Sequence, residues 1–290
     1  MLEEMKLRNL LSRVGLTLLL GCSDDTASVT DESADVAPAV EAPVTEPTVN
    51  EAPVRQVLSE SLPYGEVDSE LVYGHFAFPA DMVEPLPAVV VIHERWGLDD
   101  TVRAQADQLA AQGYIVLAVD LFNGRTAAEG LASNKLMQDV LESPDEALEN
   151  IRLALDFVRS VAGAPTVAVL GSDLGGEWAL KAATGLPDMI DAAVTIYGQV
   201  SSDTEQLSAL QAPLLGLFGG KDGVILVDTV RAFEQSLQGL DKTHTIHVYP
   251  EAEHYFLNPS RENRFRPGAA SDAWSRVAAF LSTHLAEAAQ

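Results

Sequence analysis

Asp173 lies at a point in the chain where an acidic side chain could take a direct part in catalysis. The surrounding residues 165–178 read PTVAVLGSDLGGEW. The apolar, β-branched run before Asp173 is typical of a strand buried on both faces, and the glycines after it begin a helical segment. A strand, a tight glycine-flanked turn and a helix together present a nucleophile at the top of a sheet. Glycine is needed beside such a turn because a Cβ atom would collide with the neighbouring strand or helix.

Two side chains that could act with Asp173 follow later predicted strands. Asp222 comes after the strand that ends at Phe218, and His254 comes after the strand that ends at Tyr249. Nucleophile, acid and histidine in this order are typical of a hydrolytic triad. His254 is expected to be the general base, because an imidazole titrates near neutral pH, and Asp222 is expected to orient its ring.

Neighbouring backbone and aromatic groups could complete the site. The N–H of Leu174, directly after the expected nucleophile, and that of Arg95, after an early strand, are placed to form an oxyanion hole. Trp96, Tyr197 and Tyr255 are candidates for the wall of a pocket. For Tyr197, packing in the core is an equally good explanation.

An α/β fold with a mainly parallel sheet and helices on both faces would bring these residues together. Ligand sites in such sheets lie beyond the carboxyl ends of the strands, where the candidate residues fall. The predicted strands are 64–67, 71–78, 88–92, 114–119, 167–170, 192–197, 214–218 and 245–249. The predicted helices are 100–111 with Asp100 as cap, one beginning in a capping box at Ser143, one from Gly175 through Lys181, 227–237 and 272–287. A single domain over residues 57–290 accounts for all of them.

This domain resembles the dienelactone hydrolase family of the α/β-hydrolase superfamily, from about residue 64 to residue 285. The matching segments are PAVVVIHERWGL (87–98), AAQGYIVLAVDLFNGR (110–125), GSDLGG (171–176), APLLGLFGGKDGVI (212–225) and YPEAEHYFLNP (249–259). The first and last are fairly specific to that family. The resemblance implies an α/β-hydrolase fold and hydrolysis of esters or lactones of small carboxylic acids; no cofactor or metal is expected.

The same resemblance implies roles for two more residues and shows two departures. It implies that Glu94 lies against the nucleophile and restrains it at rest, and that Arg125 binds a substrate carboxylate. The family has a cysteine where this chain has Asp173, and a second arginine where it has Asn258, four residues after the histidine. An anionic lactone would therefore lack one of its partners, and the identity of the nucleophile is open.

Asp173 is compatible with three roles. It could attack an alkyl carbon, as in haloalkane dehalogenases and epoxide hydrolases, but Leu174 stands where dehalogenases carry a halide-binding tryptophan. It could attack an activated ester or act as a base for water, sharing a proton with Glu94, because neighbouring carboxylates do not both stay charged. Or hydrolysis is lost, and the cleft binds a ligand or a metal held by Glu94, Asp173 and His254. An exposed Asp173 near His254 favours catalysis, whereas one buried against Glu94 or paired with Arg95 favours a disabled site. Asp222, His254 and the glycines around the turn at Asp173 (the nucleophile elbow) are retained, which favours a hydrolase of weak or altered activity.

The composition limits the partners of the protein. The 290-residue chain is 47% hydrophobic, carries a net charge of −25 and has a single cysteine, Cys22. Such an acidic surface argues against nucleic acid and against anionic membrane surfaces as partners. One cysteine excludes a disulfide within the chain. We expect a monomer that acts on a small molecule.

The first 56 residues predict a membrane anchor outside the cytoplasm. Residues 1–22 combine positive charges, a short apolar run and the ending LLGC, which resembles the lipobox of bacterial lipoproteins and makes Cys22 the lipidated residue. Residues 23–56 contain eight acidic residues, four prolines and no aromatic residue, which predicts an extended tether. Attachment would be only through the lipid on Cys22, in the outer membrane facing the periplasm if the host has two membranes.

Overall fold

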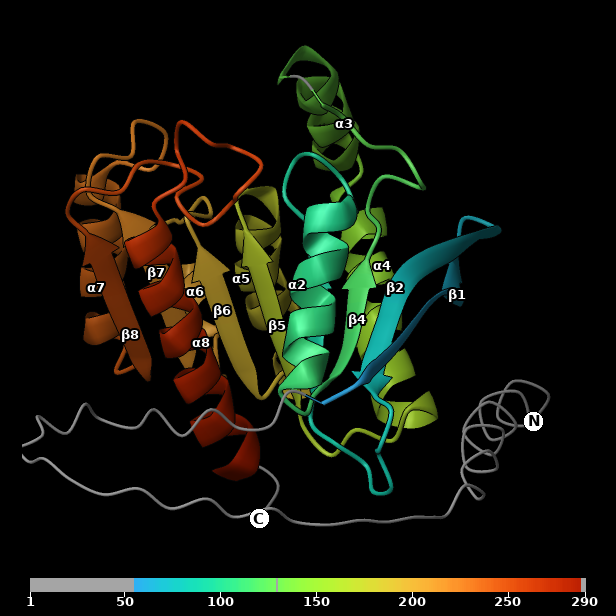
Figure 1. Cartoon of the computed structure of the whole chain (residues 1–290). Helices are drawn as coiled ribbons and strands as arrows, with labels where there is room; N and C mark the ends of the chain where they lie inside the picture. Colours follow the sequence, from blue (N-terminus) through green and yellow to red (C-terminus); the bar gives the residue numbers. More distant parts are fainter. Residues whose placement is uncertain (1–54, 129, 288–290) are drawn as a thin grey trace, which may run out of the picture. The chain divides into compact units, whose positions relative to one another are not determined.

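One sheet of eight strands forms the centre of the computed structural model, which describes residues 55–128 and 130–287 (Figure 1). The strand order is β1-β2-β4-β3-β5-β6-β7-β8. β1 and β2 form an antiparallel hairpin, β2 is antiparallel to β4, and all later pairings are parallel. The bounds are β1 Val57–Val67, β2 Glu70–Pro79, β3 Ala88–Ile92, β4 Ile115–Val119, β5 Val167–Ser172, β6 Ala192–Ile196, β7 Leu214–Gly219 and β8 His244–Tyr249.

Helices cover both faces of this sheet (Figure 1). The α-helices are α2 Asp100–Ala111, α3 Gly130–Glu142, α4 Pro144–Asp156, α5 Leu174–Gly185, α6 Thr204–Ser208, α7 Val227–Gly239 and α8 Pro267–Glu287. The buried side chains of α2 and α8 pack on one face, and those of α4, α5 and α7 pack on the other. The predicted α/β fold with a mainly parallel sheet is therefore confirmed.

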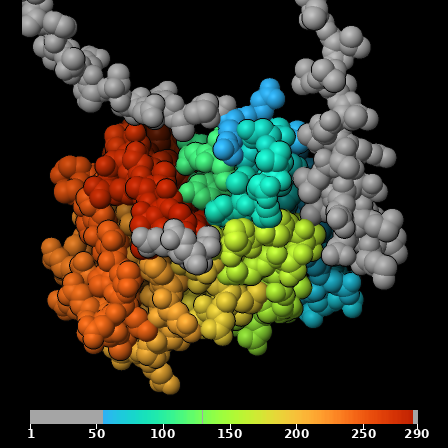
Figure 2. All heavy atoms as spheres, turned by 90° about the horizontal axis from the view of Figure 1, so that it is seen from below, coloured from blue at the N-terminus to red at the C-terminus, as the bar shows by residue number. Residues whose placement is uncertain are grey.

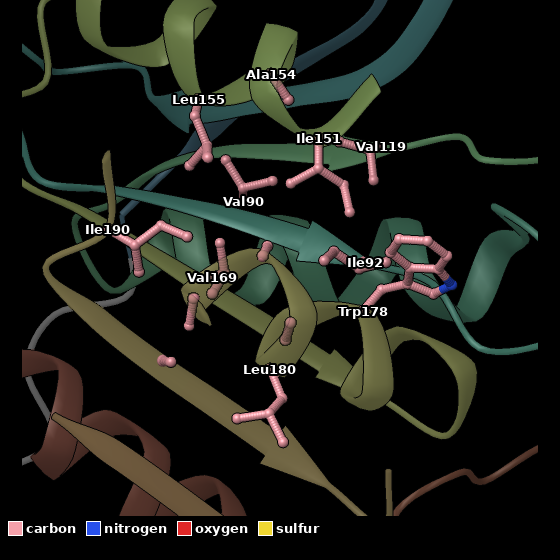
Figure 3. Close-up of a cluster of buried hydrophobic side chains, with 14 of the residues drawn as sticks. Val90, Ile92, Val119, Ile151, Ala154, Leu155, Val169, Trp178, Leu180 and Ile190 are labelled. Atoms are coloured by element: carbon pink, nitrogen blue, oxygen red, sulfur yellow. The ribbon is translucent and has the colours of Figure 1, made fainter. Parts of the chain in front are cut away.

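The largest core lies between the central strands and helices α4 and α5. Figure 3 shows Ile151 of α4 and Trp178 of α5 directed towards strand residues that include Ile92 and Val169. Every residue of β3 and β4 is buried, as expected for parallel strands that are covered on both faces. This packing fixes the end of β5 and the start of α5, the two elements that flank Asp173.

The amino ends of the parallel strands form one edge of the domain, opposite the edge where the carboxyl ends of these strands and Asp173 lie. Val57 at the start of β1 pairs with Pro79 at the end of β2, and β2 runs antiparallel to β4, so Val57 lies towards this edge. The Oγ1 atom of Thr166, directly before β5, donates a hydrogen bond of 3.0 Å to the carbonyl of Leu285. Figure 2, seen from below, shows the red helix α8 at this end of the molecule.

The predicted elements are present, with local corrections. The cap of α2 is Asp99, not Asp100, and its Oδ1 atom accepts a hydrogen bond of 3.1 Å from the N–H of Val102. Ser143 precedes α4 as predicted, but its side chain makes no capping hydrogen bond. Helices α3 and α6 were not predicted. None of the helices in the described ranges is long and apolar enough to cross a membrane. The predicted leader, its Cys22 and residues 23–54 of the tether lie outside the described residues.

Candidate active site

Asp173 stands at a sharp turn between β5 and α5. Its backbone has φ 54° and ψ −118°, a combination that residues other than glycine rarely adopt. The glycines around it permit this turn. A Cβ atom on Gly171 would lie 2.0 Å from the carbonyl oxygen of Gly175, and one on Gly175 would lie 2.0 Å from that of Ile92. The predicted nucleophile-elbow geometry is therefore present, with Asp173 at its tip.

The structure brings Asp173, His254 and Asp222 into one hydrogen-bonded row. The Nε2 atom of His254 lies 3.2 Å from Oδ1 of Asp173, and its Nδ1 atom lies 2.7 Å from Oδ2 of Asp222. Asp222 is held in turn by the N–H groups of Val224 and Ile225, at 2.7 and 2.9 Å from its Oδ1 atom. Each member of the row follows the carboxyl end of a strand, as the sequence predicts.

Arg95 holds the carboxylate of Asp173 from the other side. Its Nε atom donates to Oδ2 at 2.7 Å and its Nη2 atom donates to Oδ1 at 2.8 Å, a bidentate ion pair. The backbone N–H of Arg95 also donates to Oδ2, at 3.2 Å. That N–H is the one expected to bind a substrate oxyanion. The other expected donor, the N–H of Leu174, lies in the first turn of α5, where the helix supplies no acceptor for it.

These contacts fix the charges of the row. Burial opposes ionisation of Asp173, but hydrogen bonds from His254 and Arg95 lower its pKa to about 2. Burial likewise disfavours charge on His254, yet its hydrogen bonds to Asp173 and Asp222 raise its pKa to about 9. At neutral pH the site therefore holds an anionic Asp173 and a cationic His254. Asp173 and His254 are only 5% and 4% exposed.

Glu94 lies beside the row but is bonded elsewhere. Its Oε1 atom accepts hydrogen bonds from the hydroxyls of Ser172 (3.1 Å) and Tyr197 (2.7 Å), and its Oε2 atom accepts one of 2.7 Å from Asn258. Burial, and then the charge of Asp173, raise the pKa of Glu94. The side-chain hydrogen bonds to the Asp173 carboxylate come from Arg95 and His254, and the restraint that the resemblance assigned to Glu94 stays a prediction. Tyr197 is fully buried, so its ring packs in the core and its hydroxyl positions Glu94.

Of the predicted substrate-binding residues, Trp96 and Tyr255 lie near His254, whereas Arg125 does not. The rings of Trp96 and Tyr255 lie 5.9 Å apart, and the Tyr255 ring lies 4.3 Å from that of His254. The guanidinium of Arg261 stacks 3.5 Å over Trp96, a contact that no sequence signal indicated. Arg125 belongs elsewhere, because its Nη1 atom donates to Asp139 at 2.9 Å and its side chain is half exposed.

The predicted role of Arg125, binding of a substrate carboxylate, stays a prediction. Arg125 lines a cavity of about 370 Å³ between the β1–β2 hairpin and helices α3 and α4, to which no member of the row contributes. The metal site considered for Glu94, Asp173 and His254 is not supported. In the part of the chain that the structure describes, no three acidic, histidine or cysteine side chains are arranged to hold a metal ion.

Comparison with known proteins places this geometry in context. The family model described as Dienelactone hydrolase family matches residues 72–285. A Saccharolobus solfataricus protein provisionally named carboxymethylenebutenolidase is 29% identical over 245 residues, covering 71% of this chain and 92% of that protein. A crystal structure of a candidate dienelactone hydrolase from Klebsiella pneumoniae has 26% identity and a TM-score of 0.69, covering 79% of this chain and 99% of that one. A dienelactone hydrolase-like promiscuous phosphotriesterase from metagenomic libraries shares the fold, with 20% identity and a TM-score of 0.72 over 79% of this chain and 98% of its own.

Proposed function

The chain belongs to the dienelactone hydrolase family, and on that premise we propose that it hydrolyses ester or lactone bonds of small carboxylic acids, with an activity weakened or altered by Asp173. The observation that carries the proposal is the bridge made by His254, which lies 2.7 Å from Asp222 and 3.2 Å from Asp173. A histidine so placed can exchange a proton with whatever reacts at the turn. The name of the Saccharolobus relative supports an ester or lactone as the substrate class.

The charge state of the row suits an anionic nucleophile. Asp173 would attack the acyl carbon with a carboxylate oxygen, and the departing alcohol oxygen would take the proton of the cationic His254. The product of this step is a mixed anhydride on Asp173. Neutral His254 would then remove a proton from water as the water oxygen attacks the anhydride, which releases the acid and restores Asp173 as a carboxylate. Asp222 would stabilise the imidazolium at both ends of the cycle.

Two properties of Asp173 explain why the activity is expected to be weak. Each of its carboxylate oxygens accepts hydrogen bonds from two donors, so both oxygens are engaged in the resting state. Its pKa of about 2 also means a weakly basic oxygen, and weakly basic oxygens are poor acyl acceptors. A cysteine thiolate at the same turn would be a far better nucleophile.

Replacement of Asp173 by cysteine tests the proposal. We expect Asp173→Cys to raise hydrolysis of p-nitrophenyl acetate by at least about 10²-fold over wild type, the lower range for a positioned acid–base group. An alkylating reagent should abolish the gain without affecting wild-type activity. His254→Ala in the same background should remove the gain, whereas the matched change His244→Ala, on strand β8, should leave it.

A folded Asp173→Cys protein without hydrolysis above background would contradict the proposal. It would instead favour the second candidate, a protein that binds a small molecule without hydrolysing it. The bidentate ion pair between Arg95 and Asp173 is the observation that favours this alternative.

Independently of either function, we propose that the mature protein is a lipoprotein anchored outside the cytoplasm through Cys22, on the basis of the LLGC ending of its leader.

A further inference from the structure

The carboxylate of Asp173 has a complete set of hydrogen-bond donors. Oδ2 accepts from the backbone N–H and the Nε atom of Arg95, and Oδ1 accepts from the Nη2 atom of Arg95 and from Nε2 of His254. Two of these donors form the fork of a guanidinium, whose planar geometry matches a carboxylate. In the resting state neither oxygen is free of a donor, so the carboxylate is bound as a carboxylate ligand would be.

The donors are held in place by elements other than the turn that carries Asp173. Arg95 follows β3, and its backbone position is fixed by the buried residues on either side of it, Glu94 and Trp96. His254 follows β8 and is oriented by Asp222, whose Oδ2 atom lies 2.7 Å from Nδ1. Removal of the Asp173 side chain would therefore leave these donors facing a vacated volume. The Arg95 side chain is 21% exposed and the Asp173 side chain 4% exposed, so the vacated volume would be nearly enclosed, with Arg95 between it and solvent.

We propose that Arg95 and His254 form a binding site for a small carboxylate, and that Asp173 occupies this site in the resting protein as an internal ligand. The ligand class is a monocarboxylate, because the site offers one guanidinium fork, one imidazolium and one backbone N–H. A carboxylate is also the product of ester hydrolysis. The identification of the natural ligand with that product rests on the proposed function; the binding site itself does not.

Asp173→Gly provides a direct test in the full-length chain. Glycine tolerates φ 54° and ψ −118°, so the turn should persist without its side chain. Acetate replaces the lost atoms, since its methyl and carboxylate groups correspond to the Cβ and carboxylate of aspartate. We expect acetate to raise the Tm of Asp173→Gly saturably, by about 3–6 °C at ten times its Kd, for a domain of this size. Wild type should show a much smaller rise at the same acetate concentration, because its own carboxylate competes for the site.

A chloride control and two arginine variants distinguish acetate binding at this site from a general effect of salt on the Tm. Chloride at equal ionic strength should leave the Tm of Asp173→Gly unchanged. The double variant Asp173→Gly/Arg95→Gln should lose the acetate response. Asp173→Gly/Arg152→Gln should keep it, because Arg152 pairs with Glu149 and Asp156 on helix α4. If the glycine variant does not fold, Asp173→Ala with formate in place of acetate allows the same comparison, because alanine keeps the Cβ atom and formate replaces only the carboxylate.

An equal acetate response in wild type and Asp173→Gly would overturn the proposal, as would a response that survives Arg95→Gln. These outcomes are independent of hydrolysis. Acetate binding to Asp173→Gly without any esterase activity in Asp173→Cys would refute the proposed function and leave the carboxylate site intact. The reverse pair of results would refute the site and leave the hydrolase.

Discussion

The charge on His254 determines how the resting site responds to pH. Its pKa in the folded protein is about 9, above the ordinary histidine value of about 6.5, because its hydrogen bonds to Asp173 and Asp222 outweigh the effect of burial. A group with a raised pKa contributes stability that is full below about pH 6.5 and is lost as the pH rises through about 9. We therefore expect the Tm to fall between pH 7 and pH 10.

Two variants test whether His254 causes this fall in Tm between pH 7 and pH 10. His254→Gln should flatten the Tm profile between pH 7 and pH 10 relative to wild type, because the titrating group is gone. The change His244→Gln, on β8, should leave the wild-type slope in place. Equal slopes in wild type and His254→Gln, measured by scanning calorimetry, would show that His254 does not hold the predicted charge.

Residue types at strand ends were the predictable part of the site. Asp173 and Asp222 each follow a strongly apolar strand, and His254 follows the more polar strand β8, so the topology of a parallel sheet is enough to bring them together. Long side chains were not predictable in the same way, because the sequence does not indicate which way a flexible guanidinium turns. Arg95 was expected to act through its backbone N–H, with an ion pair to Asp173 considered only as the sign of a disabled site. Arg125 was expected to bind a substrate carboxylate. In the structure each one lies against an acidic partner, Asp173 or Asp139.

At the scale of elements, the turn between β5 and α5 requires a residue without a side chain at position 175. A Cβ atom on Gly175 would lie 2.0 Å from the carbonyl oxygen of Ile92 and 2.7 Å from that of His93, both backbone atoms that cannot move independently of β3. We expect Gly175→Ala to destabilise the protein by about 3 kcal/mol or more, which corresponds to a fall in Tm of at least about 6 °C.

The matched control is Gly268→Ala at the start of α8, where an added Cβ atom meets nothing within 4 Å. There alanine is the better helix former, so the Tm should stay the same or rise slightly. Thermal melts of the purified variants make the comparison. A Gly175→Ala protein as stable as Gly268→Ala would show that the elbow is looser than described.

Buried strands were predicted better than helices α3 and α6, which were not predicted. The apolar runs of β3 and β4 are nearly continuous, and their bounds agree with the structure to within one residue. Helix α3 has only three buried residues, Ser133, Leu136 and Val140, and one of them is polar. A pattern this weak does not stand out from a loop. Helix α6 is five residues long, too short to show a helical period.

At the scale of the whole molecule, the proposed anchor predicts where the protein resides. Cys22→Ser removes the only thiol that could be lipidated, so the variant should leave the membrane fraction or remain unprocessed. Fractionation and labelling with radioactive palmitate in a bacterial host measure both outcomes. Incorporation of label into Cys22→Ser at the wild-type level would contradict the lipoprotein proposal, without bearing on the site.

The edge of the sheet opposite the site has a practical consequence for orientation. Val57 and the Thr166–Leu285 hydrogen bond both lie towards the amino ends of the parallel strands, whereas Asp173 and His254 follow the carboxyl ends. Val57 therefore lies on the side of the domain away from Asp173 and His254. A domain immobilised on a solid support through that end would present the edge with Asp173 and His254 to the surrounding solution, and a fusion partner joined there would not need to be removed before substrates are screened.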